Sequence, residues 1–404
     1  MPIPAPSDTL EERLRSELDA LEQAGNKRLL RTVRPEGLYL WHQGKRYLNL
    51  SSNDYLGLSA SPYAALPLAD YWQHTFGPEA TSAFPHGNPA SRLMTGNSPE
   101  YDILESELSA LFPGKEALIL SCGYMVNSGL MPALTTPDDL ILADKLVHAS
   151  IIEGLQHTQA PFRRFRHNDV AHLEKLLQGA KPGQTVWVIV ESIYSMDGDL
   201  APLRDIISLR ERYPIRLYVD EAHSFGVRGP HGAGLCAELG ISDQVDLLVC
   251  TFGKALAGAG ACVLCSPVVR QYLINRMRPL IFSTALPPCT LQWDAMVVHE
   301  MRSPSLTTQG YPSMDSLRIR LAHHLEDLKQ LTSLHPTSQI IPLPAGSNKR
   351  ALAMAAHGLE RSLWLTAIRH PTVPLGAARI RLSINAGLTS EHIRTLADLC
   401  NNPG

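Results

Sequence analysis

Lys254 and Asp220 are the two residues of this chain whose types and spacing could do chemistry together. Each ends a motif that follows a short apolar run: 247–250 precedes Thr-Phe-Gly-Lys, and 217–219 precedes Asp-Glu-Ala-His. Both runs are typical of buried parallel strands, whose carboxyl ends open onto the crevice where α/β sheets bind ligands. A lysine there can form a Schiff base, and a carboxylate one strand away can hold a protonated pyridine nitrogen. Together they predict an enzyme that uses pyridoxal phosphate (PLP).

Lys254 also has simpler interpretations. A nucleotide P-loop is excluded, because that motif needs glycine where Leu248 stands and serine or threonine where Ala255 stands. A solvated surface position fits poorly with the Ala-Leu-Ala-Gly stretch that follows the lysine. Taken alone, the residue is explained equally well by a structural or a functional role. Burial would lower the pKa of its amine, as a Schiff-base lysine requires, and Asp220 and His223 nearby favour the functional role.

Asp220 ends an otherwise apolar strand, and aspartate is rarely buried without a partner. One interpretation is a helix cap, since Ala222 and Ser224 could begin a helix. The functional interpretation is that Asp220 holds the ring nitrogen of PLP as N–H⁺, so that the ring withdraws electrons from the α-carbon of the substrate. His223 would then reach the phenolic oxygen of the ring.

Other polar residues follow further predicted strands of the same sheet. His148 could stack its imidazole on a flat cofactor, although a lone histidine is more often structural. Gly123 and Tyr124 open a helix whose backbone N–H groups suit a phosphate, although glycine at such a turn is also common for steric reasons. Ser195 lies outside any Gly-x-Ser-x-Gly elbow, and its hydroxyl could donate to the ring oxygen.

The elements that must position these residues form an alternating pattern between about 104 and 287. Apolar strands separated by helical stretches predict an α/β fold with a mostly parallel sheet and helices on both faces. The strands are expected at 117–120, 140–143, 186–190, 217–219, 247–250 and 261–264. Leucines on one helical face predict a short N-terminal helix at 10–21, with Asp8 or Thr9 as the cap, and a long amphipathic helix at 317–328. A last helix is expected at 391–399.

The 404 residues are too many for one compact core. We expect an N-terminal helix and extended segment over 1–52, a large PLP-binding α/β domain over 53–288, and a small C-terminal α+β domain over 289–404. Hydrophobic residues make up 44% and charged residues 19%, as in ordinary globular proteins. The net charge of -3 argues against nucleic acid as a partner. No membrane span or secretory signal is expected, so the prediction is a cytoplasmic protein.

The seven cysteines suit reduced thiols in a cytoplasm. Cys262 and Cys265 have the spacing of a metal-binding pair, but they lie in a predicted strand, where residues three apart face opposite sides. No second pair supplies the remaining ligands of a metal. The sequence therefore predicts buried structural thiols and no metal site.

Six segments together resemble the α-oxoamine synthase family of fold-type I PLP-dependent enzymes, over nearly the whole chain. They are Leu50-Ser-Ser-Asn-Asp-Tyr-Leu-Gly-Leu58, Arg163-Arg-Phe-Arg-His-Asn-Asp-Val170, Tyr194-Ser-Met-Asp-Gly-Asp199, Asp220-Glu-Ala-His223, Thr251-Phe-Gly-Lys254 and Ala367-Ile-Arg-His-Pro-Thr-Val-Pro374. The lysine and acid motifs are shared by the whole family. The second and last segments point to the branch that works in biotin biosynthesis.

The resemblance implies a role for each matching residue. The cofactor-binding residues would be Gly123, Tyr124, His148, Ser195, Asp220, His223, Thr251 and Lys254. Lys254 would carry PLP as a Schiff base, with Lys254, His148 and Asp220 as the catalytic residues. Arg28, His148, Arg369 and Thr372 would bind substrates, and Lys27 or Arg31 are alternatives to Arg28. Family members are homodimers, and Ser283 and Thr284 would reach the cofactor phosphate bound by the partner subunit.

The implied reaction is a decarboxylative condensation of L-alanine with a pimeloyl thioester, carried by coenzyme A or acyl-carrier protein. Sister synthases are the main alternative: glycine C-acetyltransferase, 5-aminolevulinate synthase or a quorum-signal synthase. A non-catalytic partner subunit typically lacks the lysine, and an ordinary aminotransferase would release no carbon dioxide. One segment, 77–92, is longer than in relatives and is expected to border the substrate entrance. The choice of carrier and the acyl chain length stay open.

Overall fold

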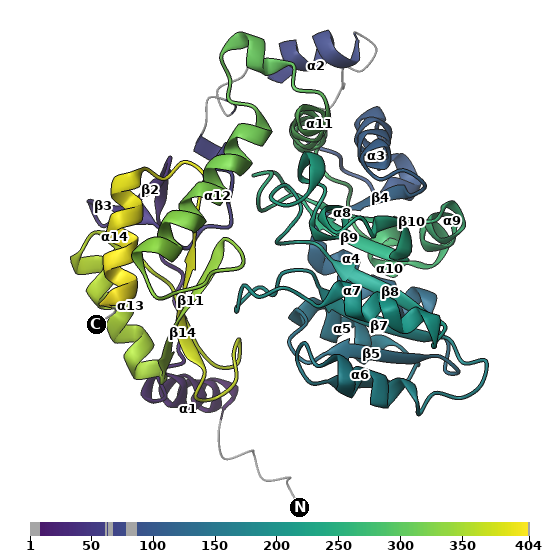
Figure 1. The fold of residues 1–404 in the computed structure, drawn as a ribbon, viewed down its shortest axis with the longest axis horizontal. Helices are drawn as coiled ribbons and strands as arrows, with labels where there is room; N and C mark the ends of the chain where they lie inside the picture. The colour runs from purple at the N-terminus through teal and green to yellow at the C-terminus, as the bar shows by residue number, and fades with distance from the viewer. Residues whose placement is uncertain (1–8, 61–62, 64–67, 78–86, 403–404) are drawn as a thin grey trace, which may run out of the picture.

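The computed structural model describes residues 9–60, 63, 68–77 and 87–402. It has two lobes (Figure 1): a large lobe from the middle of the chain, and a small lobe that combines the beginning and the end of the described chain. Most of the expected substrate-entrance segment, 78–86, lies outside the described residues. Short helical turns are η1 (Leu58–Ala60), the π-helical η4 (Arg92–Gly96), η5 (Leu209–Glu211), η6 (Pro230–Gly232), η7 (Ser242–Gln244) and η8 (Leu306–Gln309).

A seven-stranded sheet forms the centre of the large lobe. Its order is β4 (Glu116–Leu120), β10 (Ala261–Cys265), β9 (Leu247–Thr251), β8 (Ile215–Asp220), β7 (Val186–Glu191), β5 (Leu140–Asp144) and β6 (Phe162–Phe165). β10 is antiparallel to both neighbours, and the other pairs are parallel. The prediction of a mostly parallel sheet is confirmed, with all six expected strands. Sequence analysis missed β6, because Arg163 and Arg164 are exposed on this edge strand and interrupt any apolar run.

Helices cover both faces of this sheet, as predicted for an α/β fold. One face packs on α4 (Gly123–Leu134), α5 (Ala149–His157), α9 (Pro267–Arg276) and α10 (Arg278–Ile281). The other packs on α3 (Pro99–Leu111), α6 (Val170–Leu177), α7 (Leu203–Ser208), α8 (Leu235–Glu238) and α11 (Pro288–Arg302). Cys262 and Cys265 pack into opposite cores and are both buried free thiols, as expected.

The small lobe contains two small sheets. One has the order β1 (Arg34–Glu36), β2 (Tyr39–His42), β3 (Lys45–Asn49) and β12 (Leu363–Trp364), and the other has the order β11 (Ile340–Gly346), β14 (Ala378–Ser383) and β13 (Ala367–Ile368). Helices α12 (Met314–Leu331), α13 (Asn348–Glu360) and α14 (Ser390–Asn401) pack around them. The long helix expected at 317–328 and the last helix expected at 391–399 are confirmed by α12 and α14.

The expected division of the chain into domains at about residues 52 and 288 stays a prediction. Two contacts in the structure cross these boundaries. Leu48 on β3 lies opposite Leu363 on β12, so the first segment shares a sheet with the C-terminal part of the chain. Helix α11 begins at the expected boundary near 288 and packs against α3 of the large lobe. A second helix of the large lobe, α2 (Leu68–Phe76), also contacts α11.

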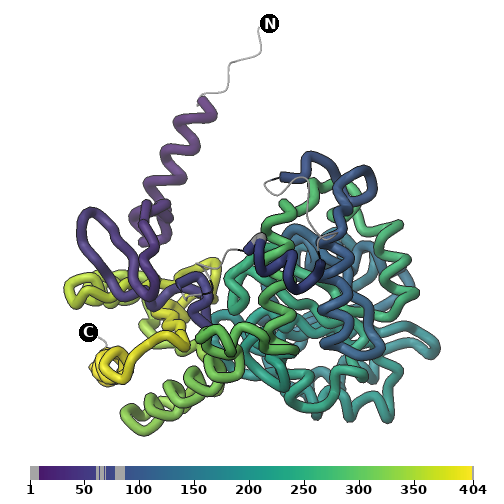
Figure 2. The backbone as a smooth tube through the Cα atoms, turned by 90° about the horizontal axis from the view of Figure 1, so that it is seen from above, coloured from purple at the N-terminus to yellow at the C-terminus, as the bar shows by residue number. Residues whose placement is uncertain are grey.

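Helix α1 (Leu10–Gln23) begins at the predicted place. Thr9 caps it, and Thr9 and Glu12 exchange hydrogen bonds in a capping box. The alternative cap, Asp8, lies outside the described residues. The helix projects away from both lobes (Figure 2), and its leucine face at positions 10, 14, 18 and 21 is exposed.

The loop after β7 touches the small lobe at Gly198. This glycine has a φ of 71°, and a Cβ built on it would lie 2.1 Å from the carbonyl oxygen of Ile340, the first residue of β11. Only a residue without a side chain therefore fits this contact between the lobes.

We predict that Gly198→Ala lowers the free energy of unfolding by about 3 kcal/mol, because the backbone of β11 must move. Gly183 is the matched control, since its φ is 75° and nothing lies within 4 Å of the position that a methyl group would take. Gly183→Ala should cost only about 1 kcal/mol, the cost of the left-handed conformation. Chemical denaturation measures both, and equal costs would contradict the steric explanation.

Candidate active site

A cavity of about 350 Å³ opens at the carboxyl ends of the central strands. Ala261 on β10 pairs with Leu120 on one side and Thr251 on the other, so the ends of β4 and β9 lie level. The structure brings seven of the residues singled out by sequence to this cavity, where their roles stay predictions: Gly123, Tyr124, His148, Asp220, His223, Thr251 and Lys254.

Asp220 is the last residue of β8 and is 3% exposed. Its Oδ2 accepts a hydrogen bond from Nδ2 of Asn127, at 2.8 Å, and its Oδ1 accepts one from the backbone N–H of Ala222, at 2.9 Å. The bond to Ala222 shows that a local turn and a cavity-facing carboxylate coexist at this residue. Asn127 is itself held by Tyr218 and Ser150, so the carboxylate has a fixed orientation.

Lys254 lies three residues beyond β9, in a tightly closed loop. Phe252 accepts a hydrogen bond from Gly258 and donates one to Gly260, both at 3.0 Å. Trp293 on α11 donates from Nε1 to the carbonyl of Leu256, at 2.9 Å. The Lys254 amine is half-buried and has no hydrogen-bond or ion-pair partner among the described residues.

Burial lowers the pKa of the Lys254 amine, while the charge of Asp220 acts in the opposite direction. A lowered pKa makes the unprotonated, nucleophilic amine more abundant. Such an amine, unpaired in a cavity and beside a carboxylate, is suited to bond covalently to an aldehyde.

His223 is buried behind the cavity and contacts a residue far away in the sequence. Its Nδ1 lies 2.7 Å from the hydroxyl of Tyr55, and Arg381 on β14 donates from Nη2 to the same hydroxyl, at 3.0 Å. Burial lowers the pKa of His223 well below its usual value, and the charges of Lys254 and Arg381 lower it further. His223 is therefore neutral and can donate one N–H to a ligand.

His148 caps the N-terminus of α5. Its Nδ1 lies 2.7 Å from the Ser150 hydroxyl and also accepts the backbone N–H of Ser150, at 3.2 Å. Burial lowers the pKa of His148, so its ring is neutral and planar at the cavity wall. This position is compatible with stacking on a flat ring.

The N-terminus of α4 supplies an anion site at the other end of the cavity. The helix has 12 residues, and its N-cap Cys122 makes no side-chain hydrogen bond to its first N–H groups. A Cβ on Gly123 would lie 2.7 Å from Cγ2 of Thr251, so a side chain would fill the space beside these N–H groups. Tyr124 lines the cavity and is exposed.

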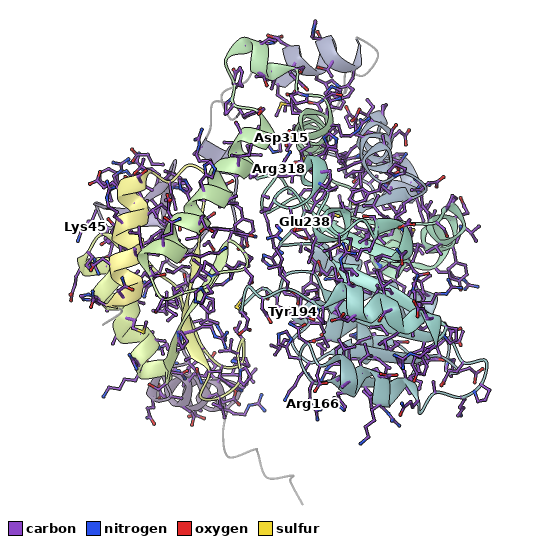
Figure 3. The ribbon with its side chains drawn as sticks, in the orientation of Figure 1. Lys45, Arg166, Tyr194, Glu238, Asp315 and Arg318 are labelled. Atoms are coloured by element: carbon purple, nitrogen blue, oxygen red, sulfur yellow. The ribbon has the colours of Figure 1, made fainter. Side chains whose placement is uncertain are left out.

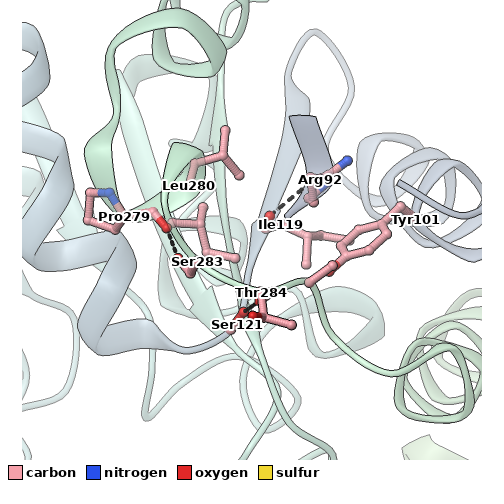
Figure 4. A pocket seen from close by; sticks show the side chains of 10 residues that line it. Arg92, Tyr101, Ile119, Ser121, Pro279, Leu280, Ser283 and Thr284 are labelled. Carbon is pink, nitrogen blue, oxygen red and sulfur yellow. Dashed lines mark hydrogen bonds between the residues drawn. The ribbon is translucent and has the colours of Figure 1, made fainter. Parts of the chain in front are cut away.

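A smaller pocket of about 10 Å³ adjoins this end (Figure 4). It shares Ser121 with the main cavity, and the Ser121 hydroxyl donates to the carbonyl of Thr284, at 3.0 Å. Ser283 lines the same pocket. The expectation that Ser283 and Thr284 contact a phosphate bound by the partner subunit stays a prediction.

Four of the predicted residues do not line the main cavity. Ser195 is buried and its carbonyl accepts from Nε of Arg381, at 2.6 Å. Arg28, Arg369 and Thr372 lie together in the small lobe, where Arg28 donates to the Thr372 hydroxyl at 3.4 Å. Arg369 donates to the carbonyls of Gly25 and Lys27.

The positive charges of the small lobe form one cluster. Burial lowers the pKa of Arg369, and the nearby charges of Arg28 and Arg31 lower it further. Like charges this close attract an anion such as a carboxylate. The sequence prediction placed these residues at the substrate, and the structure brings them together without testing that role.

Sequence analysis missed Glu191, Asn127 and Arg381. Glu191 and Asn127 line the cavity, and Arg381 joins the small lobe to Tyr55 and Ser195. Glu191 ends an apolar strand just as Asp220 does, so the same sequence pattern could have identified it as a site residue. Asn127 inside a helix and Arg381 inside a strand carry no comparable signal.

A second polar network supports the loop that carries Ser195. His167 lies between two carboxylates, with Nδ1 at 2.9 Å from Asp144 and Nε2 at 2.6 Å from Asp199. Both nitrogens must donate, so the ring is charged. Tyr194, which lies on the side of the large lobe facing the small lobe (Figure 3), packs edge-on against this ring with centroids 4.4 Å apart.

The sequence matches the family described as "Aminotransferase class I and II" over residues 45–399. It is 42% identical to "8-amino-7-oxononanoate synthase" of Chlorobaculum parvum, over 96% of this chain and 97% of that protein. It is 38% identical to "Putative 8-amino-7-oxononanoate synthase" of Haemophilus influenzae, over 96% and 99%. A serine palmitoyltransferase from S. paucimobilis, solved "with bound PLP- Myriocin Aldimine", superposes with a TM-score of 0.84 at 25% identity, over 98% of each chain.

The chain therefore belongs to the class I and II aminotransferase family and is a PLP-dependent transferase with the fold-type I architecture. Within it, the curated relatives group this chain with the 8-amino-7-oxononanoate synthases, which are acyltransferases.

Pyridoxal 5′-phosphate is the cofactor, and the cavity residues fit it. The unpaired Lys254 amine suits its aldehyde, Asp220 suits its pyridine nitrogen, and the free N–H groups beside Gly123 suit its phosphate. The described residues include no cluster of three or more His, Cys, Asp or Glu side chains that could hold a metal ion. None of the described helices has the length and apolarity needed to cross a membrane.

The charged His167 predicts a pH dependence of stability. Burial alone would lower the pKa of His167, but Asp144 and Asp199 outweigh it and raise the pKa from 6.5 to about 10. Because the folded pKa is higher than the unfolded one, the stabilisation is complete below pH 6.5 and is lost as pH rises through about 10. We expect the stability advantage of wild type over His167→Gln to shrink across that window. Denaturation at several pH values measures it, and a constant difference would contradict a charged ring.

Proposed function

We propose that this enzyme condenses L-alanine with a pimeloyl thioester and releases carbon dioxide and the free thiol carrier. The product would be 8-amino-7-oxononanoate, in biotin biosynthesis. The observation that carries the proposal is the unpaired Lys254 amine in one cavity with Asp220. The names of the curated relatives supply the choice of reaction within the family.

Bound PLP supplies an electron-poor ring that stabilises negative charge at the α-carbon of an attached amino acid. Asp220, fixed by Asn127 and Ala222, would keep the ring nitrogen protonated. Neutral His223 would donate to the phenolic oxygen, and His148 would lie against the ring. Lys254 would hold the aldehyde carbon at rest, and its amine, once free, would take the α-proton as general base, for which its lowered pKa is suited.

The small lobe would bind the substrates. Arg369 binds the carboxylate of alanine through a charge-assisted contact, with Thr372 beside it and Arg28 contributing positive charge. The α-carbon would attack the carbonyl carbon of the thioester and expel the thiolate, which takes up a proton and leaves as the free thiol. The carboxylate held by Arg369 would then depart as carbon dioxide, and the Lys254 ammonium would return a proton to the α-carbon. These assignments require the small lobe to present this cluster to the cavity.

We further propose a homodimer in the cytoplasm. Large apolar side chains are exposed next to the cavity and on the segments around the smaller pocket: Leu93, Met94, Tyr124 and Phe282. Burying these side chains against a second copy would remove apolar surface from water. Acyl-carrier protein is one candidate carrier of the acyl group, and coenzyme A is the other.

The direct test is mass spectrometry of the products formed from L-alanine and pimeloyl-CoA by the PLP-loaded protein. We expect 8-amino-7-oxononanoate, carbon dioxide and free coenzyme A in equal amounts, and Lys254→Ala should reduce turnover by several orders of magnitude. Lys349→Ala, at an exposed lysine, is the control and should behave as wild type. Faster turnover with glycine and acetyl-CoA or succinyl-CoA would favour a sister synthase, and a keto acid without carbon dioxide would favour an aminotransferase.

Arg369→Gln should raise the KM for L-alanine about 10- to 100-fold, the range expected for loss of one charge-assisted hydrogen bond. The KM for the thioester and the affinity for PLP should change little. Arg350→Gln, at an exposed arginine on α13, is the matched control. Steady-state kinetics would reject the assignment if both variants had the same KM for alanine as wild type.

A further inference from the structure

Glu191 is a buried carboxyl in the wall of the cavity. It is the last residue of β7 and is 2% exposed. In the parallel ladder it lies opposite Asp220 on β8, so the two carboxyl groups point to the same side of the sheet. The cavity therefore holds two acidic side chains on adjacent strands.

The hydrogen bonds of these two carboxyl groups differ. Both oxygens of Asp220 accept hydrogen bonds, from Asn127 and Ala222. The backbone N–H groups of Ser195 and His148 point to the carboxyl of Glu191, but its Oε1 has no hydrogen-bond partner among the described residues. A buried polar atom without a partner is destabilising, so the described residues leave part of the hydrogen-bonding capacity of this cavity-wall carboxyl unused.

The surroundings of Glu191 favour its neutral form. Burial raises the pKa of Glu191 well above its usual value, and the charge of Asp220 raises it further, while Lys254 and the two N–H groups lower it. Two adjacent buried carboxyl groups do not both ionise readily, so such a pair keeps one proton. The titratable groups facing Glu191 from neighbouring elements are Asp220, Tyr218, Lys254, His148 and Tyr194.

We infer that Glu191 is a further cofactor-binding residue, a neutral hydrogen-bond donor whose carboxyl group in the cavity wall directs its proton toward an acceptor oxygen of PLP. The carboxyl also joins the backbone of His148 to that of Ser195, and so links the segments that follow β5 and β7. Asp220 is then the carboxylate left to pair with the ring nitrogen. The inference rests on PLP binding in this cavity and not on which amino acid or thioester reacts.

Two variants distinguish a neutral hydrogen-bond donor at Glu191 from a negatively charged carboxylate there. Glu191→Gln keeps the shape and a neutral donor, whereas Glu191→Leu removes the donor. The first readout is the infrared spectrum of the PLP-free protein at neutral pH, in which wild type should show a protonated-carboxyl band that Glu191→Gln lacks. The second is the dissociation constant for PLP, which should stay within about threefold of wild type for Gln and rise about tenfold or more for Leu.

Glu300→Gln is the matched control, because Glu300 is a buried carboxyl outside the cavity that accepts hydrogen bonds from Tyr71 and Ser305. It should leave the affinity for PLP unchanged. If Glu191→Leu does not fold, the infrared comparison of wild type with Glu191→Gln still shows whether Glu191 carries a proton.

Three results would overturn the inference. An unchanged protonated-carboxyl region in the infrared spectrum of Glu191→Gln, with loss of a carboxylate band instead, would mean that Glu191 is ionised. A shift of about one pH unit or more, in Glu191→Gln, of the pH at which the absorbance of lysine-bound PLP changes would mean that a buried charge had been lost. Unchanged PLP affinity in Glu191→Leu would mean that the donor does not reach the cofactor. None of these readouts depends on turnover, so they separate this inference from the proposed reaction.

Discussion

The cavity holds the half-buried Lys254 amine, three residues beyond the end of β9, and the buried Asp220 carboxylate at the end of the adjacent strand β8. Burying charged groups is costly unless each has a partner, and the structure supplies partners for only one of them. Asp220 is held by Asn127 and Ala222, while the lysine amine is left unpaired with a lowered pKa. This asymmetry makes the site ready for a ligand that bonds to the amine and places a positive ring nitrogen against the carboxylate.

The rest of the large lobe maintains that geometry. The hydrogen bonds from Gly258 to Phe252 and from Phe252 to Gly260 close the Lys254 loop, and Trp293 fixes it from α11. The small lobe reaches the same region through Arg381, which bonds to Tyr55 and to the carbonyl of Ser195. The first and last parts of the described chain thus form the small lobe together, and Arg381 connects this lobe to residues beside the cavity of the large lobe.

Sequence analysis predicted the fold and most of the cavity because both depend on short apolar runs. The strands before Asp220 and Thr251 are uniformly buried, so their ends mark the site without further information. Strand β6 could not be predicted this way, because its arginines are exposed on an edge. The contacts of Arg381 depend on how the two lobes pack, and no local pattern reveals that. The small lobe also brings Arg28 close to Arg369 and Thr372, which lie more than 300 residues later in the sequence. This proximity depends on the pairing of β3 with β12, which no local sequence pattern reveals.

The covalent bond between Lys254 and the cofactor is the central claim, and reduction with borohydride tests it most directly. The PLP-loaded protein would be reduced, digested and analysed by peptide mass spectrometry. The account predicts a phosphopyridoxyl group on Lys254 and on no other lysine. A reduced adduct on a different lysine, or an unmodified Lys254 in protein that has retained its PLP, would contradict it.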